Sequence, residues 1–371
     1  MTEAPPGRPG RPVVVKIGTS SLTSADGRLD GSALERLAAE VVAVRAGGRP
    51  TVVVSSGAVM AGMTVVGVER PSSVPELQAL SAIGQIELVH RWRVALAAHN
   101  VVTAQVLLTQ HAFRERHQYL QARGTFARLL AMGAVPVVNE NDAVTADELP
   151  FGDNDRLAAL VAHLVGADTL VLLTDTPGLF TADPRRDQSA SLIEEIIEVD
   201  HELERVAGKG TDRGRGGMAS KLAAAKIAAW TGVRTVIADA ARAGVVAAAV
   251  DGVDGVGTVL HPHDRRLPAR KLWIAFATGS AGTITVDGGA RRALTEGNRS
   301  LLPAGVRHHE GTFEAGEAVE VVDEDGAVFA KGLVQMSSAE LAVAAGRQTS
   351  ELGDGVPHET IHRDDLVVLP Q

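Results

Sequence analysis

Residues 136–155 read Pro-Val-Val-Asn-Glu-Asn-Asp-Ala-Val-Thr-Ala-Asp-Glu-Leu-Pro-Phe-Gly-Asp-Asn-Asp. The stretch begins within a short apolar run, residues 134–138, of the kind that forms a buried parallel strand. A loop rich in carboxylates and amides follows, and a helical pattern begins at Arg156. Polar residues between a strand and a helix are typical of the ligand-binding edge of an open α/β sheet. A solvated acidic loop is the alternative, but Phe151-Gly152 and the repeated pairing of Asn with an acid favour a binding site.

Other segments repeat this succession of apolar strand, polar turn and helix. Strands are expected at residues 13–17, 51–55, 101–108, 169–175 and 234–238. After the second of them, Ser56-Gly57 would present a hydroxyl and free backbone N–H groups at the start of a helix. Strands that alternate with helices favour a parallel sheet whose polar turns share one edge. The sequence therefore predicts an α/β fold with a doubly wound, mostly parallel sheet that binds ligands along that edge.

The chain changes character after about residue 260. A connector with Pro and Arg leads into short strand-like runs, at residues 272–275, 282–286, 318–322, 327–334 and 366–369, with one helix-like piece at 338–345. This pattern predicts a small β-rich domain. The expected organisation is a disordered lead-in over residues 1–12, a first domain over 13–260, a linker over 261–272 and a second domain over 273–371.

Composition limits the classes of function. The 371 residues suffice for two domains with separate cores. The sequence contains no uninterrupted apolar run of about 18 residues, the length needed to cross a membrane. Cysteine is absent, which excludes disulfides and thiolate chemistry and fits a cytoplasmic protein. No metal site is predicted, because no third ligand is suitably spaced from the histidines of the second domain, His308, His309, His358 and His362.

Charge is unevenly distributed. Residues 273–371 contain 7 Lys+Arg and 15 Asp+Glu, a net charge of −8, whereas the first 272 residues contain 29 and 30, a net charge of −1. Affinity for nucleic acid depends on Lys and Arg that neutralise phosphates. The acidic second domain therefore argues against RNA binding.

Two segments of the first domain carry positive charge that an anion could meet. Lys16 lies inside an apolar run, where its ammonium needs a partner or a bound anion, unless it lies on an edge strand and reaches water. Residues 208–221 form a basic, glycine-rich loop before a helical pattern, and such loops can wrap phosphates with backbone N–H groups. The loop matches Gly-x-Gly-x-x-Ala at residues 214–219, but the charged, helix-like segment before it disfavours a dinucleotide fold.

A set of motifs occurs in a fixed order along nearly the whole chain, from about residue 13 to 365. They are Val14-Val-Lys-Ile-Gly-Thr-Ser, Val54-Ser-Ser-Gly-Ala, Val138-Asn-Glu-Asn-Asp, Gly152-Asp-Asn-Asp, Leu173-Thr-Asp, Gly216-Gly-Met-Ala-Ser-Lys, Gly282-Thr-Ile-Thr-Val-Asp-Gly-Gly-Ala and Ser300-Leu-Leu-Pro-Ala-Gly. Each motif is weak alone, but their ordered conjunction is specific. Together they resemble the bacterial glutamate 5-kinases, in which an amino acid kinase domain is joined to a PUA domain.

The resemblance implies a reaction and a set of site residues. The reaction is ATP-dependent phosphorylation of the L-glutamate side-chain carboxylate, the first step of proline biosynthesis, with Mg²⁺ required and proline as feedback inhibitor. The resemblance places the glutamate contacts at Ser56, Asp142 and Asn154. The implied ATP-site residues are Lys16, Thr174, Asp175, Arg215, Gly216, Gly217, Met218, Ala219, Ser220 and Lys221. Arg215 departs from the family, which usually has threonine there, so the nucleotide contacts of that turn stay open.

The chemistry of these residues agrees with the implied reaction. A carboxylate nucleophile is already ionised at neutral pH, so no general base is needed. What remains is to position the reactants and to neutralise charge on the transferring phosphoryl group. Lys16 and Lys221 can do this as point charges, and Asp153 could orient them, so these three are the predicted catalytic residues. Asp142 can receive the substrate ammonium, and Asn154 and Ser56 can hydrogen-bond the substrate.

Alternatives within and outside this fold remain. Acetylglutamate kinase, aspartokinase and uridylate kinase share the first domain, and the PUA-like second domain is what favours glutamate 5-kinase. An RNA-binding role through that domain is a further alternative, as is a role in modulating activity or assembly. The resemblance also implies a homo-oligomer, a dimer or tetramer, and a glutamyl phosphate reductase as the partner that receives the labile product.

Overall fold

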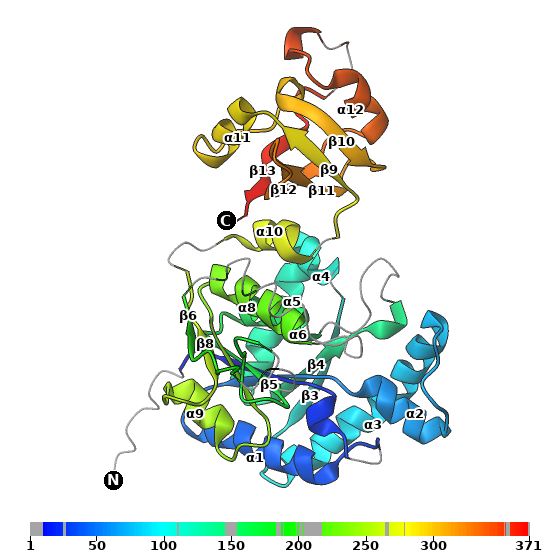
Figure 1. Ribbon diagram of the computed structural model, residues 1–371. Coiled ribbons are helices and arrows are strands. Elements are labelled where there is room, and N and C mark those ends of the chain that lie inside the picture. Colours follow the sequence, from blue (N-terminus) through cyan, green and yellow to red (C-terminus); the bar gives the residue numbers. More distant parts are fainter. Residues whose placement is uncertain are drawn as a thin grey trace. The chain divides into compact units, whose positions relative to one another are not determined.

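The protein is described by a computed structural model (Figure 1) that covers residues 10–24, 27–109, 111–144, 154–182, 187, 189–197, 199, 203, 217–263, 267–277, 279–351, 353 and 357–369. The chain divides into two compact units, residues 1–266 and 267–371. The division falls within the stretch 261–272 that the sequence suggests as a linker. Within the described ranges, no helix has the length and apolar character that a membrane span requires.

The first unit is built on an eight-stranded sheet with the order β3-β4-β2-β1-β5-β7-β8-β6. Its strands are β1 Val13–Ile17, β2 Thr51–Ser55, β3 Thr103–Leu108, β4 Val135–Glu140, β5 Thr169–Thr174, β6 Glu195–Ile196, β7 Arg234–Asp239 and β8 Thr258–Leu260. All neighbouring strands are parallel except β7 and β8. The predicted mostly parallel α/β sheet is confirmed.

Helices cover both faces of this sheet (Figure 1). They are α1 Gly31–Ala46, α2 Ala58–Val66, α3 Val74–Ala97, α4 His111–Arg114, α5 Arg116–Ala131, α6 Asn154–Val165, α8 Met218–Trp230 and α9 Val245–Asp251. Helices α1, α3 and α9 share one apolar core with alternate residues of β1, namely Val13, Val15 and Ile17. Because side chains alternate across a strand, Lys16 points to the other face, where α6 and α8 pack together.

The helices α2 and α3 approach each other unusually closely. A Cβ atom added to Gly84 would lie 1.9 Å from the Ala58 carbonyl oxygen, and one added to Gly62 would lie 1.9 Å from the Leu80 carbonyl oxygen. Only glycine fits at such a backbone approach. The contact brings the middle of α3 beside the carboxyl end of the sheet.

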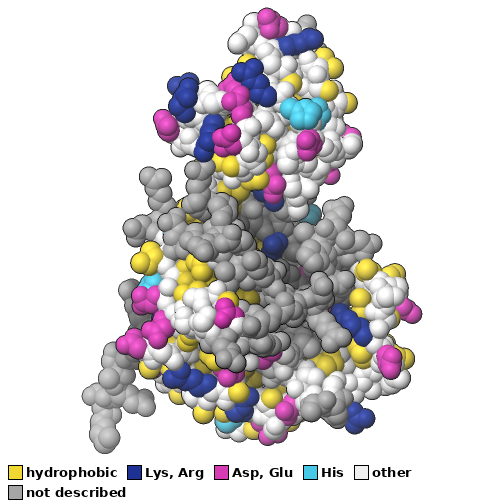
Figure 2. Space-filling model, viewed as in Figure 1, with side chains coloured by type: hydrophobic (Ala, Val, Ile, Leu, Met, Phe, Trp, Pro, Cys, Tyr) yellow, Lys and Arg dark blue, Asp and Glu magenta, His cyan; other side chains and the backbone are white. Residues whose placement is uncertain are grey.

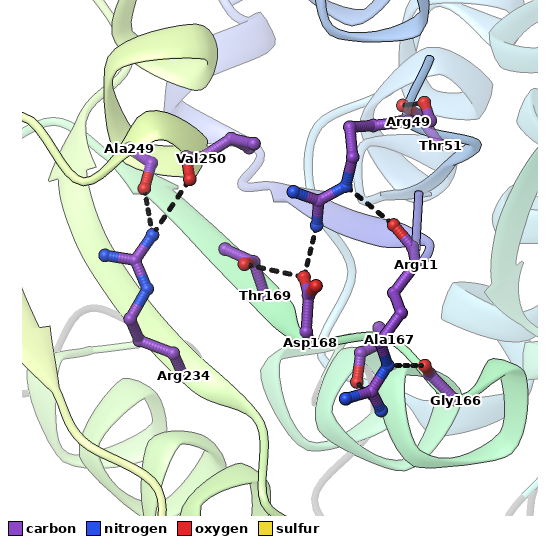
Figure 3. Close-up of polar contacts among 10 residues, drawn as sticks. All are labelled: Arg11, Arg49, Thr51, Gly166, Ala167, Asp168, Thr169, Arg234, Ala249 and Val250. Carbon is purple, nitrogen blue, oxygen red and sulfur yellow. Dashed lines mark hydrogen bonds and ion pairs between the residues drawn. The ribbon is translucent and has the colours of Figure 1, made fainter. Parts of the chain in front are cut away.

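The amino ends of the strands are joined by arginines (Figure 3). Arg11 donates to the carbonyl oxygens of Gly166 and Ala167, both at 3.2 Å. Arg49 donates to the Arg11 carbonyl oxygen at 2.8 Å and forms an ion pair with Asp168. Arg234 donates to the carbonyl oxygens that end α9, those of Ala249 and Val250. The contacts of Arg11 and Arg234 satisfy carbonyl oxygens at or just after the ends of α6 and α9, where the helix itself supplies no donor.

The second unit has a five-stranded sheet with the order β10-β9-β11-β12-β13 and a core of its own. Its elements are α10 Ala269–Leu272, β9 Gly282–Val286, α11 Gly288–Thr295, β10 Val306–Gly311, β11 Ala318–Val322, β12 Val328–Val334, α12 Ser338–Ala344 and β13 Ile361–Val368. All strand pairs are antiparallel except β9 and β11. The predicted β-rich character of this region is confirmed.

Two predictions for this unit need correction. Residues 272–275 are not a strand, because α10 leads directly into a π-helical turn, Trp273–Ala277. A short apolar run does not distinguish a buried strand from a buried helix, and Ile274 is fully buried. The strand β10, Val-Arg-His-His-Glu-Gly, was not predicted, because this terminal strand of the sheet is largely exposed and lacks an apolar alternation.

Candidate active site at the carboxyl edge of the sheet

The carboxyl ends of β1, β2 and β5 lie at one level. Ile17 is paired with Ser55 on one side and with Leu173 on the other. Gly18 and Ser56, which follow β1 and β2, and Thr174, the last residue of β5, therefore meet at the same edge, as the sequence predicts.

Two buried lysines meet on one buried carboxylate at this edge. Lys16 Nζ lies 2.6 Å from Asp155 Oδ1, and Lys221 Nζ lies 3.2 Å from Asp155 Oδ2. Ser220 Oγ donates to the same Oδ2 at 2.7 Å. Each of the three charged residues is at most 5% exposed. The three groups together carry one net positive charge, so the cluster is suited to an anion.

The ionisation of this cluster follows from burial and from its own charges. Burial acts to raise the pKa of Asp155, but the ammonium groups of Lys16 and Lys221 outweigh burial and lower that pKa. For Lys221, burial lowers the pKa, and the Asp155 carboxylate opposes this shift. We conclude that Asp155 stays ionised and holds the two ammonium groups in place.

A chain of amides lies beside the lysines. Asn154 Nδ2 donates to Ser56 Oγ at 3.0 Å and to Asn139 Oδ1 at 2.9 Å. Asn139 Nδ2 in turn donates to Gln85 Oε1 on α3 at 2.8 Å. All three amide side chains are buried. The chain therefore links helix α6 to helix α3 across the end of β4.

Two buried acceptors of this region are left without a hydrogen bond from the described residues. They are Asn154 Oδ1 and Asp142 Oδ1. The other carboxylate oxygen of Asp142 accepts a hydrogen bond from Ser81. Burial raises the pKa of Asp142, and the Ser81 hydroxyl opposes that rise. Buried acceptors that lack a donor in the protein suit a ligand that brings one, such as an ammonium group.

Comparison with known proteins agrees with this geometry. Residues 11–239 match the model of the amino acid kinase family, and residues 282–355 match the model of the PUA domain. The chain belongs to the amino acid kinase family.

Its curated relatives extend over nearly its whole length. The chain is 47% identical to glutamate 5-kinase of Myxococcus xanthus over 368 residues, which cover 98% of this chain and 97% of that protein. It is 44% identical to glutamate 5-kinase of Mycolicibacterium vanbaalenii, with 98% of each chain covered. Among solved structures, carbamate kinase from Giardia lamblia is 18% identical with a TM-score of 0.49, and the similarity covers 68% of this chain and 99% of that one.

Most of the sequence-predicted site residues lie at this edge of the kinase fold. Lys16 and Lys221 meet on Asp155, and Asn154 is hydrogen-bonded to Ser56. Asp142, just after β4, is joined to Ser81 of α3. Thr174 is buried at the end of β5 and donates to the exposed Asp175 carboxylate at 3.2 Å. Helix α8 starts with Met218, Ala219 and Ser220, and Gly217 precedes it as N-cap. Asp153, Arg215 and Gly216 lie outside the described residues.

Three residues of the site, Asp155, Asn139 and Gln85, were not predicted from the sequence. The motif Gly152-Asp-Asn-Asp contains two acids, and the sequence alone does not say which one points to the lysines. The structure shows that Asp155, in the first turn of α6, contacts both. Gln85 gave no signal at all, because its contact with Asn139 joins residues 54 positions apart.

Proposed function

We propose that this member of the amino acid kinase family is a glutamate 5-kinase. It transfers the terminal phosphoryl group of ATP to the side-chain carboxylate of L-glutamate and so forms γ-glutamyl phosphate, the first step of proline biosynthesis. Curated relatives that bear this name match nearly the whole chain. The structural observation that carries the proposal is the pair of lysines fixed on Asp155, at the same sheet edge as two buried acceptors to which no described residue donates.

Lys16 and Lys221 act on the phosphoryl group as it moves. The glutamate carboxylate attacks the terminal phosphorus of ATP, the bond to the bridging oxygen breaks, and ADP leaves with the bonding electron pair. Negative charge spreads over the transferring oxygens, and catalysis consists mainly of positioning and of stabilising that charge. Two ammonium groups that Asp155 already holds need no reorganisation during this step. The roles of Asp153 and Arg215 remain predictions.

The substrate amino group is received by the two acceptors that have no donor among the described residues. Asp142 Oδ1 and Asn154 Oδ1 accept hydrogen bonds from the ammonium of L-glutamate. Ser56 Oγ accepts from Asn154, so its own proton is left to donate to the substrate. A charged ammonium compensates the cost of burying the Asp142 carboxylate.

The nucleotide lies on the side of β5 and α8. The first turn of α8 presents backbone N–H groups, which bind phosphate, and Lys16, Thr174, Asp175 and residues 215–221 form the proposed ATP site. Mg²⁺ enters with the nucleotide, because in such sites it binds mainly phosphate oxygens and water, with one or two carboxylates. The exposed Asp175 carboxylate could join that shell, and the ion would shield phosphate charge.

The wider setting of the enzyme is also proposed. We place it in the cytoplasm as a homo-oligomer that proline inhibits and whose product a glutamyl phosphate reductase receives. The second domain, which we place at residues 273–371 after a linker at 261–272, serves control or assembly rather than RNA binding. On the face drawn in Figure 2, acidic side chains of this unit lie among its basic ones, which does not favour contact with phosphates.

The choice of substrate within the family can be argued from Asp142. N-acetylglutamate lacks an ammonium group, so it would leave the buried Asp142 carboxylate without a counter-charge. Aspartate has the ammonium, but its side chain is one methylene shorter, so its carboxylate would not reach as far toward the lysines. Both arguments favour glutamate over the substrates of acetylglutamate kinase and aspartokinase.

An assay of acyl phosphate formation tests the proposal. Products are trapped with hydroxylamine in the presence of ATP and Mg²⁺, and glutamate, N-acetylglutamate and aspartate are compared, each with and without proline. We expect turnover with glutamate and suppression by proline. A preference for N-acetylglutamate or aspartate would contradict the assignment of substrate while leaving the phosphoryl-transfer site intact.

A further inference from the structure

Gln85 lies in the middle of α3 and has an unusual hydrogen-bonding state. The residue is 7% exposed, and its Oε1 accepts a hydrogen bond from Asn139 Nδ2 at 2.8 Å. Its Nε2 is buried and makes no hydrogen bond within the described part of the chain. Leaving a buried amide donor unpaired is unfavourable. The orientation of this amide must therefore be imposed by its neighbours.

The backbone of β4 fixes the orientation of the Gln85 amide. The N–H of Glu140 donates to Asn139 Oδ1 at 2.9 Å. Because a backbone N–H can only donate, the Asn139 atom that faces it must be the oxygen, which places Asn139 Nδ2 toward Gln85. An amide nitrogen needs an acceptor, so Gln85 must present Oε1. One backbone donor thus fixes the direction of both side chains.

The orientation of Asn139 also fixes the orientation of the Asn154 amide. The oxygen of Asn139 also accepts from Asn154 at 2.9 Å, so Asn154 must present its Nδ2. The second hydrogen of that Nδ2 is donated to Ser56 Oγ at 3.0 Å. With both hydrogens used, Asn154 Oδ1 is the atom left over, and no described residue donates to it. A chain of three amides therefore ends in a carbonyl oxygen rather than an amino group.

We propose that Gln85 is a positioning residue that directs the Asn154 carbonyl oxygen toward the ammonium group of the amino acid substrate. Gln85 contacts Asn139, not the substrate. Without Oε1, the Nδ2 of Asn139 has no acceptor, so Asn139 is held only by the Glu140 N–H, and Asn154 loses the firmly held partner that keeps its amide in one orientation. A turned Asn154 would present NH₂ to the ammonium, and two donors repel. The inference rests on the proposed glutamate kinase activity.

Close packing of α3 on α2 explains how Gln85 comes to lie beside Asn139. Gly84 lies next to Gln85, and a Cβ atom there would lie 1.9 Å from the Ala58 carbonyl oxygen and 2.2 Å from the Gly62 nitrogen. Glycine at this position lets α3 sit against α2 at a distance that no other residue allows. The neighbouring turn of α3 carries Ser81, which holds the second acceptor, Asp142. One helix face therefore orients both proposed acceptors of the ammonium.

Gln85→Met tests the inference, because it keeps the size of the side chain and removes the amide. We expect the KM for glutamate to rise about tenfold, with the KM for ATP and kcat changed less than about twofold. A second readout uses glutarate, which is glutamate without the ammonium. The ratio of kcat/KM for glutamate to kcat/KM for glutarate should fall about tenfold, whereas a general loosening of the site would lower both values equally and overturn the inference.

A double-mutant cycle with Asn154→Ala separates an indirect role from a direct one. If Gln85 acts through Asn154, Gln85→Met should lower kcat/KM for glutamate less than about twofold in the Asn154→Ala background. A tenfold loss in both backgrounds would mean that Gln85 acts independently of Asn154, and would overturn the inference. Leu88→Ala, a truncation of a fully buried residue one turn along α3, is the control for lost packing and should leave the KM for glutamate unchanged.

Two further controls complete the design. Thermal unfolding of each variant shows whether it folds, and Gln85→Leu replaces Gln85→Met if the latter does not. A wild-type enzyme that does not phosphorylate glutamate would refute the proposed function itself. A wild-type enzyme that does, combined with an additive cycle, would refute only the role given to Gln85.

Discussion

The amino and carboxyl edges of the kinase sheet differ in how exposed their charged groups are and in whether these groups have partners. At the amino edge, Arg11, Arg49 and Arg234 donate to carbonyl oxygens that end strands, loops and helices (Figure 3). Its ion pair joins side chains that are 23% and 34% exposed. At the carboxyl edge the charges of Lys16, Lys221 and Asp155 are almost fully buried, and Asp142 and Asn154 each keep an acceptor without a donor from the described residues.

This difference supports the proposal that the carboxyl edge binds the substrates. A buried polar atom without a partner costs about 1–3 kcal/mol, and such a cost persists where a ligand supplies the missing partner. At the amino edge the charged groups are paired and serve stability, and the buried atoms that lack a partner among the described residues there, Thr103 Oγ1 and Thr235 Oγ1, are uncharged hydroxyls. The carboxyl edge has unsatisfied groups and serves binding. Four substitutions would break or sharpen this contrast.

The largest effect is expected from Lys16→Ala. Loss of one of the two ammonium groups removes stabilisation that acts mainly on the transferring phosphoryl group, so kcat should fall about 100- to 1,000-fold while the KM for glutamate changes little. Steady-state kinetics with the hydroxylamine assay measure both. A rise in KM as large as the fall in kcat would mean that Lys16 contributes ground-state binding instead.

The second effect concerns Asp142→Asn, which keeps the shape and removes the charge. A hydrogen bond to a charged group contributes about 1.5–3 kcal/mol, so the KM for glutamate should rise roughly 10- to 100-fold, with the KM for ATP nearly unchanged. Burial raises the pKa of Asp142 above 3.8. The wild-type advantage over Asp142→Asn should therefore shrink as the pH falls through that raised pKa, because the carboxylate becomes neutral.

The same variant tests whether the buried, ionised Asp142 carboxylate lowers the stability of the fold. A carboxylic acid whose pKa is raised in the folded state destabilises the fold when it is ionised, that is, at pH values above the folded pKa. Asp142→Asn should accordingly unfold at the same or a higher temperature than wild type at neutral pH in the absence of ligands. A clear loss of thermal stability would contradict the view that the carboxyl edge sacrifices stability for binding.

The sequence predicted the architecture better than the chemistry of the site. Buried strands followed by polar turns were enough to predict the parallel sheet and its ligand edge. Lys16 inside an apolar run correctly indicated a buried charge with a partner. Which carboxylate is that partner depends on how α6 lies on the sheet, so the sequence did not indicate Asp155.

Other features were hidden for related reasons. The link between Gln85 and Asn139 arises only when α3 packs beside the end of β4. In the second unit, β10 lacked an apolar pattern because it is an edge strand, and residues 272–275 were wrongly predicted as a strand. Local pattern therefore predicts elements, whereas contacts between distant elements determine the site.

A third substitution, Gly84→Ala, tests whether the approach of α3 to α2 supports the carboxyl edge. The added methyl group would lie against backbone atoms that have no room to move, and overpacking of this kind costs typically 1–3 kcal/mol. Thermal or urea unfolding measures it, and the KM for glutamate should rise as well. Gly124→Ala on α5 is the matched control, because nothing lies within 4 Å of the added Cβ there; it should stabilise the protein by up to about 1 kcal/mol.

The smallest effect is expected at the amino edge, from Arg49→Ala. The substitution removes the ion pair with Asp168 and one hydrogen bond to the Arg11 carbonyl oxygen. A part-exposed ion pair contributes about 0.2–1 kcal/mol and is screened by salt, so the free energy of unfolding should fall by about 1 kcal/mol in dilute buffer and by less in 1 M salt. The Asp168 side chain is 34% exposed, so the substitution leaves no buried charge without a partner. The kcat/KM for glutamate should match that of the wild type. A change above about threefold would show that the two edges are coupled through β1 and β2 and would contradict separate roles for them.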